Sequence, residues 1–69
     1  MTEAIAYQLK TNERAFRIAA EQRVASRLAE IAADVTGPRR EALERCFRQQ
    51  ADERFAQQMA ECRRRLGVA

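Results

Sequence analysis

A single Thr-Gly-Pro break at residues 36–38 divides the 69-residue chain near its middle into two segments of similar composition. Both segments are rich in Ala, Arg, Glu, Gln and Leu, which are strong helix formers. Only two Gly and one Pro occur in the whole chain. Because Gly suits the position after a helix end and Pro suits the first turn of the next helix, the break predicts that one helix stops there and another begins.

The apolar residues of each segment keep to one face of a helix, because they recur mostly at intervals of three, four or seven residues. The first stripe predicts a helix over about residues 3–35 and consists of Ile5, Leu9, Phe16, Ala20, Val24, Leu28, Ile31 and Val35. The second predicts a helix over about residues 38–66 and consists of Leu43, Phe47, Ala51, Phe55, Met59, Cys62 and Leu66. A turn as short as residues 36–37 makes the two helices antiparallel neighbours.

The stretch Lys-Thr-Asn-Glu-Arg, residues 10–14, is the weak point of the first predicted helix. Thr and Asn are residue types that cap helix N-termini, so the helix has an alternative start at Thr11 or Asn12. In that alternative, residues 1–10 form a separate, mobile helical arm.

The chain is poor in large apolar side chains, with three Phe, one Tyr and no Trp in 69 residues. A single domain of this size seldom builds enough core to hold one copy together without a disulfide, a metal or a partner subunit. Two hairpins packed together would bury the apolar stripes of all four helices. We therefore predict an all-α fold, one helical-hairpin domain over residues 1–69 that forms a homodimeric four-helix bundle. A monomeric hairpin and a subunit of a hetero-complex are the alternatives.

The length of the apolar runs and the spacing of the cysteines indicate where in the cell the protein would be found. No apolar run approaches the roughly 20 residues that span a bilayer, and the N-terminus is acidic before it is apolar, unlike a secretory signal. Cys46 and Cys62 lie about 24 Å apart along one predicted helix, too far for an internal disulfide. We expect a soluble, cytoplasmic protein with two free thiols, although an interchain disulfide through either cysteine stays open.

Five of the thirteen basic residues have an acidic residue four positions away in the same predicted helix. Thirteen Lys and Arg against ten Asp and Glu give a net charge of +3, and the whole excess lies after residue 35. Oppositely charged residues four positions apart support a helix; these pairs are Glu13–Arg17, Arg17–Glu21, Arg40–Glu44, Glu41–Arg45, Glu44–Arg48, Arg48–Asp52 and Glu61–Arg65. Two other arginine clusters are expected at opposite ends of the hairpin: Arg39 and Arg40, and Arg63, Arg64 and Arg65. Nucleic-acid binding through them is therefore an alternative function and not the favoured one.

Two large apolar residues of the first helix fall outside its main stripe. Tyr7 and Ile18 project from nearly the opposite side, and Ala25 and Ala32 continue that line. Such a second line either packs in the dimer interface or forms a docking strip for another protein. We assign candidate partner contacts to Tyr7 and Ile18, flanked by Arg14 and Arg17.

The residue types argue against catalysis. The chain has no His, its one Ser is Ser26, and it has no Gly-rich phosphate loop. A two-helix hairpin is also expected to be too thin for a catalytic pocket. We predict a protein that is not an enzyme and has no catalytic residue, no cofactor and no metal site.

Two families offer resemblances. The segment ADERFAQQMAECRRRLG, residues 51–67, has Ala-Asp-Glu followed by an aromatic residue, a Cys and a closing Gly. In this and in its length the chain resembles Rop, the plasmid copy-number protein family whose dimeric four-helix bundles bind paired RNA stem-loops. That resemblance implies RNA contacts at Arg14, Arg17 or Arg27.

In length, in Arg and Ala content and in lacking catalytic groups, the chain also resembles small phage-encoded helical-hairpin inhibitors of the anti-quorum-sensing type. This resemblance implies a dimer that binds a bacterial quorum-sensing transcription regulator, a pilus-assembly ATPase or both. For a phage protein, the location would be the host cytoplasm. Similar hairpins serve as secretion-system co-chaperones. The favoured function is stoichiometric, inhibitory or regulatory binding to a bacterial protein.

Overall fold

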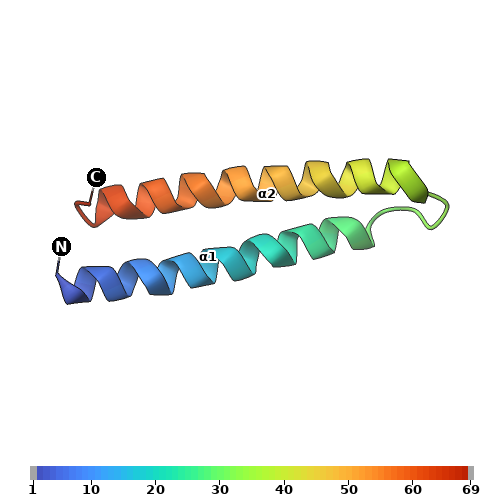
Figure 1. Ribbon diagram of the computed structural model, residues 1–69. Helices are drawn as coiled ribbons and strands as arrows, with labels where there is room; N and C mark the ends of the chain where they lie inside the picture. The colour runs from blue at the N-terminus through green and yellow to red at the C-terminus, as the bar shows by residue number, and fades with distance from the viewer. Residues whose placement is uncertain (1, 69) are drawn as a thin grey trace.

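The computed structural model describes residues 2–68, and these form two helices and no strand (Figure 1). Helix α1 spans Glu3–Ala29 and helix α2 spans Gly37–Arg65. The helices lie side by side and antiparallel, with the connecting loop at one end and both termini at the other (Figure 1). This arrangement confirms the predicted all-α hairpin. The Cα trace is 51 Å long but only 16 by 13 Å across.

Helix α1 starts as a capped helix and runs without interruption. The Thr2 hydroxyl accepts a hydrogen bond from the Ile5 backbone N–H at 3.2 Å, and Glu3 places a negative charge in the first turn. Farther along, the Thr11 hydroxyl donates to the Tyr7 carbonyl at 3.0 Å. This bond lies within the helix, so Thr11 starts no new helix, and the alternative of a separate arm over residues 1–10 is wrong.

The C-terminal end of α1 differs from the prediction. The helix ends at Ala29, six residues before the predicted end at Val35, and residues 30–36 form a loop instead of a two-residue turn. The last backbone hydrogen bonds span three residues instead of four. The Glu30 N–H donates to the Arg27 carbonyl and the Ile31 N–H to the Leu28 carbonyl, both at 3.2 Å. Two physical causes apply. Asp, Val and Thr before the Gly are weak helix formers, which favours an early helix end. Ile31 and Val35 stay half-buried in the loop, so the apolar period continues past the helix and the predicted end was too late.

Helix α2 starts and ends at glycines with positive φ, Gly37 at 63° and Gly67 just past the end at 74°. Thr36 occupies the N-cap position without a side-chain capping bond, and Pro38 lies in the first turn, as expected. At the other end, the Gly67 N–H donates to the Arg64 carbonyl and the Val68 N–H to that of Arg63. These two bonds form a Schellman motif, which requires the left-handed residue that Gly67 supplies.

We expect Gly37→Ala to lower the free energy of unfolding by about 1–2 kcal/mol, because an L-residue is strained in the left-handed region. The space around Gly37 is open, with no atom within 4 Å of an added Cβ, so the penalty is conformational and not steric. Gly37→Asn is the matched control, since Asn tolerates this region better. Urea unfolding of both variants checks this, and equal losses would contradict the conformational explanation.

The core between the helices is thin. The buried residues are Ala20, Val24, Ala51, Met59 and Cys62, and Leu28 packs against the first three. Among the described residues, no side chain is less than 2% exposed, and all three Phe are only half-buried. Most large apolar side chains of the predicted stripes therefore keep part of their surface exposed in a single copy.

The surface of the hairpin is large for its mass. Its accessible area is 5479 Å², whereas a compact monomer of 7.9 kDa exposes about 4,400 Å². The radius of gyration is 15.7 Å, compared with about 11 Å for a compact domain of this length. One copy thus leaves about 1,100 Å² more surface exposed than a compact fold of the same size.

Candidate functional site

The outer side of α1 carries the two most conspicuous exposed apolar side chains of the described residues. Tyr7 is 74% exposed and Ile18 is 53% exposed. They lie 11 residues apart, which corresponds to about 16 Å along the helix and to nearly the same side of it. Sequence periodicity placed both residues outside the core stripe, and their exposure agrees with that placement.

Ile18 is the centre of a shallow hollow of about 540 Å³, which we call the Ile18 patch. Its lining residues are Arg14, Arg17, Ile18, Glu21, Gln22 and Ala25. Three of the four predicted contact residues thus lie together, whereas Tyr7 stands apart toward the N-terminus. The patch has an apolar centre with charged groups around it, which is the composition of a small protein-binding surface.

The two arginines of the patch differ in their surroundings. The Arg17 guanidinium lies 4.5 Å from the centre of the Phe55 ring and forms an ion pair with Glu13 at 3.5 Å. Arg17 is therefore held against α2 and contributes to the hairpin itself. Within residues 2–68, Arg14 makes no ion pair within 4.0 Å, so its charge is available to a partner.

The arginines assigned to the nucleic-acid alternative do not form one continuous surface. Arg39 and Arg40 lie at the loop end of α2 and Arg63 to Arg65 at the other end, about 35 Å away. Arg64 and Arg65 also form ion pairs with Glu61, the second of them at 3.1 Å. This arrangement resembles helix-end charge compensation more than a groove for a nucleic-acid backbone.

A second surface, which the sequence reasoning missed, lies on the opposite flank of the hairpin. Two cavities of about 520 and 140 Å³ open between the helices and share Arg54; we call them together the Arg54 groove. The larger cavity is lined by Gln8, Asn12, Phe16, Arg54, Gln57, Gln58, Glu61, Cys62, Arg65 and Leu66. The smaller one is lined by Arg23, Arg27, Phe47, Gln50, Ala51 and Arg54. The expectation that so thin a hairpin has no pocket is therefore wrong.

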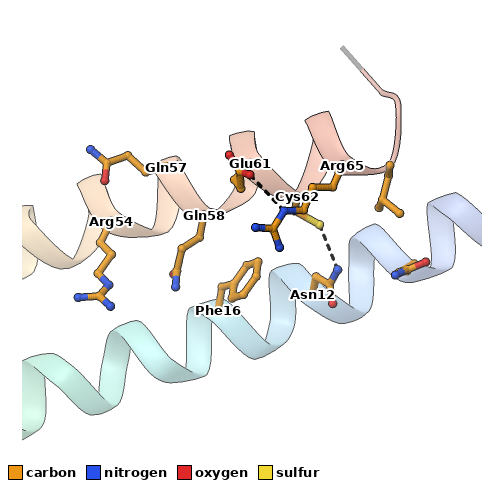
Figure 2. Close-up of a pocket in the computed structure, with 10 residues that line it drawn as sticks. Asn12, Phe16, Arg54, Gln57, Gln58, Glu61, Cys62 and Arg65 are labelled. Carbon is orange, nitrogen blue, oxygen red and sulfur yellow. Dashed lines mark hydrogen bonds and ion pairs between the residues drawn. The ribbon is translucent and has the colours of Figure 1, made fainter.

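Figure 2 shows the larger cavity, with Phe16 rising from α1 toward Gln58 and Cys62 of α2. The Asn12 side-chain N–H donates to the Cys62 sulfur at 3.0 Å and links the two helices there. Cys62 is buried, whereas Cys46 is exposed on α2, and both are free thiols. The position of Cys62 in this contact gives it a packing role.

The smaller cavity concentrates positive charge. Three of its six lining residues are Arg and none is acidic. Arg27 stacks over the Phe47 ring at 4.4 Å from its centre. Arg23 and Arg54 have no acidic residue three or four positions away in the sequence, which distinguishes them from the self-paired arginines. That absence alone does not locate this surface, because Arg14, Arg39 and Arg63 share it.

Two buried polar atoms in the Arg54 groove have no hydrogen-bond partner within the described residues. They are Arg23 Nη1, in the smaller cavity, and Gln58 Oε1, in the larger one. One is a donor and the other an acceptor. Buried polar groups are normally satisfied by protein or by ordered water, so both atoms mark positions in the groove where a further polar partner fits.

Comparison with known proteins gives no assignment, since no family model, curated protein or solved structure matches the chain. Neither helix of the described range carries an apolar stretch long enough to cross a membrane. Residues 2–68 also contain no group of three or more His, Cys, Asp and Glu side chains placed to hold a metal ion.

Proposed function

We propose that this chain is a homodimeric, non-enzymatic protein that binds a bacterial partner protein stoichiometrically and inhibits or regulates it. The observation that carries the proposal is the exposure of Tyr7 and Ile18 on the outer side of α1. Exposed aromatic and aliphatic side chains beside an unpaired arginine are the groups that dominate protein-binding energy. The partner would offer apolar pockets for both side chains and an acidic group for Arg14.

The homodimer is supported by the surplus surface of one copy. A standard interface buries about 800 Å² on each partner, which is within the excess of about 1,100 Å² left by the single hairpin. The half-buried Phe residues of the apolar stripes would lose further exposure in such an assembly. We propose a four-helix bundle as its architecture.

The resemblance to phage-encoded hairpin inhibitors suggests candidates for the partner. They are a quorum-sensing transcription regulator, which the chain would keep from DNA, and a pilus-assembly ATPase. A secretion-system co-chaperone role belongs to the same class of action. All of these act through a surface that recognises protein and need no catalytic group. Cytoplasmic location, in the host for a phage protein, is part of the proposal.

The proposal is tested by capture of partners from a bacterial lysate on the immobilised chain. We expect a defined protein to bind with one copy per hairpin, and Tyr7→Ala and Ile18→Ala to weaken its binding at least tenfold, since anchor truncation costs about 2 kcal/mol or more. Gln49→Ala, an exposed change on α2, is the matched control with unchanged binding. Binding that survives both α1 substitutions would place the partner site elsewhere.

A salt titration separates this function from the nucleic-acid alternative. Binding of RNA or DNA through Arg39, Arg40 and the Arg63–Arg65 cluster would weaken steeply with salt, in proportion to the phosphates contacted. We expect no shift of structured RNA or duplex DNA by the pure protein at low salt. A mobility shift that is lost when these five arginines are replaced by Ala would overturn the protein-binding proposal.

A further inference from the structure

We infer that the Arg54 groove is the face through which two copies pair, about a two-fold axis perpendicular to the helices. This inference rests on the proposed homodimer and specifies its interface. The occupant of the groove is thus a second copy of this chain. The argument starts from the two buried atoms without a partner, Arg23 Nη1 and Gln58 Oε1.

The register of the hairpin shows why these atoms cannot satisfy each other in one copy. Contacts beside the groove place Asn12 level with Cys62 and Arg27 level with Phe47. Figure 2 shows Gln58 level with Phe16, whereas the same register sets Arg23 level with Ala51. Phe16 and Arg23 are seven residues apart, which is about 10 Å along the axis.

A perpendicular two-fold axis removes this offset. If the axis passes midway between the two levels, close to Ala19 and Arg54, the second copy runs in the opposite direction. Gln58 of the second copy then lies level with Arg23, diagonally across the bundle because α1 faces α1 of that copy, and the reverse contact forms by symmetry. A two-fold axis parallel to the helices keeps the 10 Å offset and leaves both atoms unsatisfied. The chemistry therefore selects the antiparallel arrangement.

The same operation brings the one acidic residue of the groove toward its arginine cluster. One end holds Arg23 and Arg27 without an acidic residue, whereas the other end holds Gln58 and Glu61, which already pairs with Arg64 and Arg65. Reversal places Glu61 of the second copy within about one residue of the level of Arg27, by the same register. It would also neutralise part of the arginine cluster, whose desolvated charge is otherwise unfavourable.

This assignment leaves the proposed partner site free. The Ile18 patch, with Arg17 over Phe55 and Glu21 paired to Arg48 at 3.3 Å, lies on the other flank. Both copies in the dimer would present Tyr7 and Ile18 to solvent. Self-association and partner binding therefore use different surfaces, and their loss can be distinguished.

Cysteine cross-linking tests the face and the direction of pairing. Ala19 is half-buried next to Arg23 and lies at the inferred axis, and such an axis sets α1 beside α1 of the second copy. In a Cys46→Ser background, we expect Ala19→Cys to form a disulfide-linked dimer on mild oxidation. Ala25→Cys, in the exposed Ile18 patch, is the matched control that should stay unlinked. Cross-linking of Ala25→Cys alone would overturn the inferred face while leaving a homodimer.

Sedimentation equilibrium tests the cross-copy pair. We expect Gln58→Glu to lower the Kd of dimerisation about tenfold, because a carboxylate accepts more strongly from a guanidinium than an amide does. Gln49→Glu, on the exposed side of α2, is the control with unchanged Kd. Arg23→Ala should raise the Kd at least tenfold and remove the gain from Gln58→Glu.

Three other outcomes would each overturn the inference. A dimer whose Kd is unaffected by Arg23→Ala and Gln58→Glu pairs by another face. A single-copy species throughout the micromolar range refutes the proposed homodimer as well. A monomer whose Tm rises with inorganic phosphate at constant ionic strength, and not in the Arg23→Ala variant, assigns the smaller cavity to a small anion.

Discussion

Val24→Asp is expected to leave the chain largely unfolded at room temperature. Val24 is 3% exposed and lies in the cluster with Ala20 and Ala51, where no cationic side chain is among the buried residues. An unpaired carboxylate buried there costs several kcal/mol. A hairpin with so small a core has little stability to lose. Loss of the helical circular dichroism signal at 222 nm is the measurement.

Ile18→Asp is the matched control, because it makes a similar change six residues away on the same helix. Ile18 is 53% exposed, and surface substitutions usually alter stability by about 0.5 kcal/mol or less. We expect the helical signal and the Tm to be nearly unchanged. If the two variants lost stability equally, Ile18 would be buried in solution, and the Ile18 patch would belong to an interface needed for folding.

Phe55→Ala is expected to give the second-largest loss, about 2 kcal/mol in the free energy of unfolding. A fully buried Phe costs about 3–5 kcal/mol on truncation to Ala, and this ring is half-buried. The change also removes the surface over which Arg17 stacks at 4.5 Å. At roughly 4–8 °C per kcal/mol for a domain of this size, the Tm should fall by about 8–16 °C in a thermal melt.

Tyr7→Ala provides the comparison for an aromatic ring outside the core. Tyr7 is 74% exposed, so its truncation should change the Tm by only a few degrees. A small effect of Phe55→Ala together with a large effect of Tyr7→Ala would reverse the assignment of core and outer surface. The pair therefore also checks that binding losses caused by Tyr7→Ala do not come from unfolding.

The hairpin could be predicted because two local signals agree. The apolar stripes have a helical period in both segments, and Gly37 and Pro38 mark the start of the second helix. The end of the first helix could not be placed from the stripe, since Ile31 and Val35 continue its period within the loop. Apolar spacing reports which residues face the core, whereas the helix end depends on how the chain turns toward Gly37.

The exposed positions Tyr7 and Ile18 could be inferred from one helix alone, because angular position depends only on spacing. The Arg54 groove could not be found in that way. It depends on which residues of α2 stand opposite Arg23 and Arg27, and this register is set by contacts such as that of Asn12 with Cys62. Within the sequence, Arg23 and Arg54 stand out only in having no acidic residue three or four positions away, and Arg14, Arg39 and Arg63 share that feature.

The antiparallel register also has a kinetic consequence. Arg27 and Phe47 are 20 residues apart in the chain, whereas Asn12 and Cys62 are 50 apart. Closing a longer segment costs more chain entropy. The helices should therefore associate first near the loop, and their contacts should then form progressively toward the termini. The Asn12–Cys62 end would form last and open first. The larger cavity of the Arg54 groove therefore lies in the part of the hairpin where local opening is most frequent.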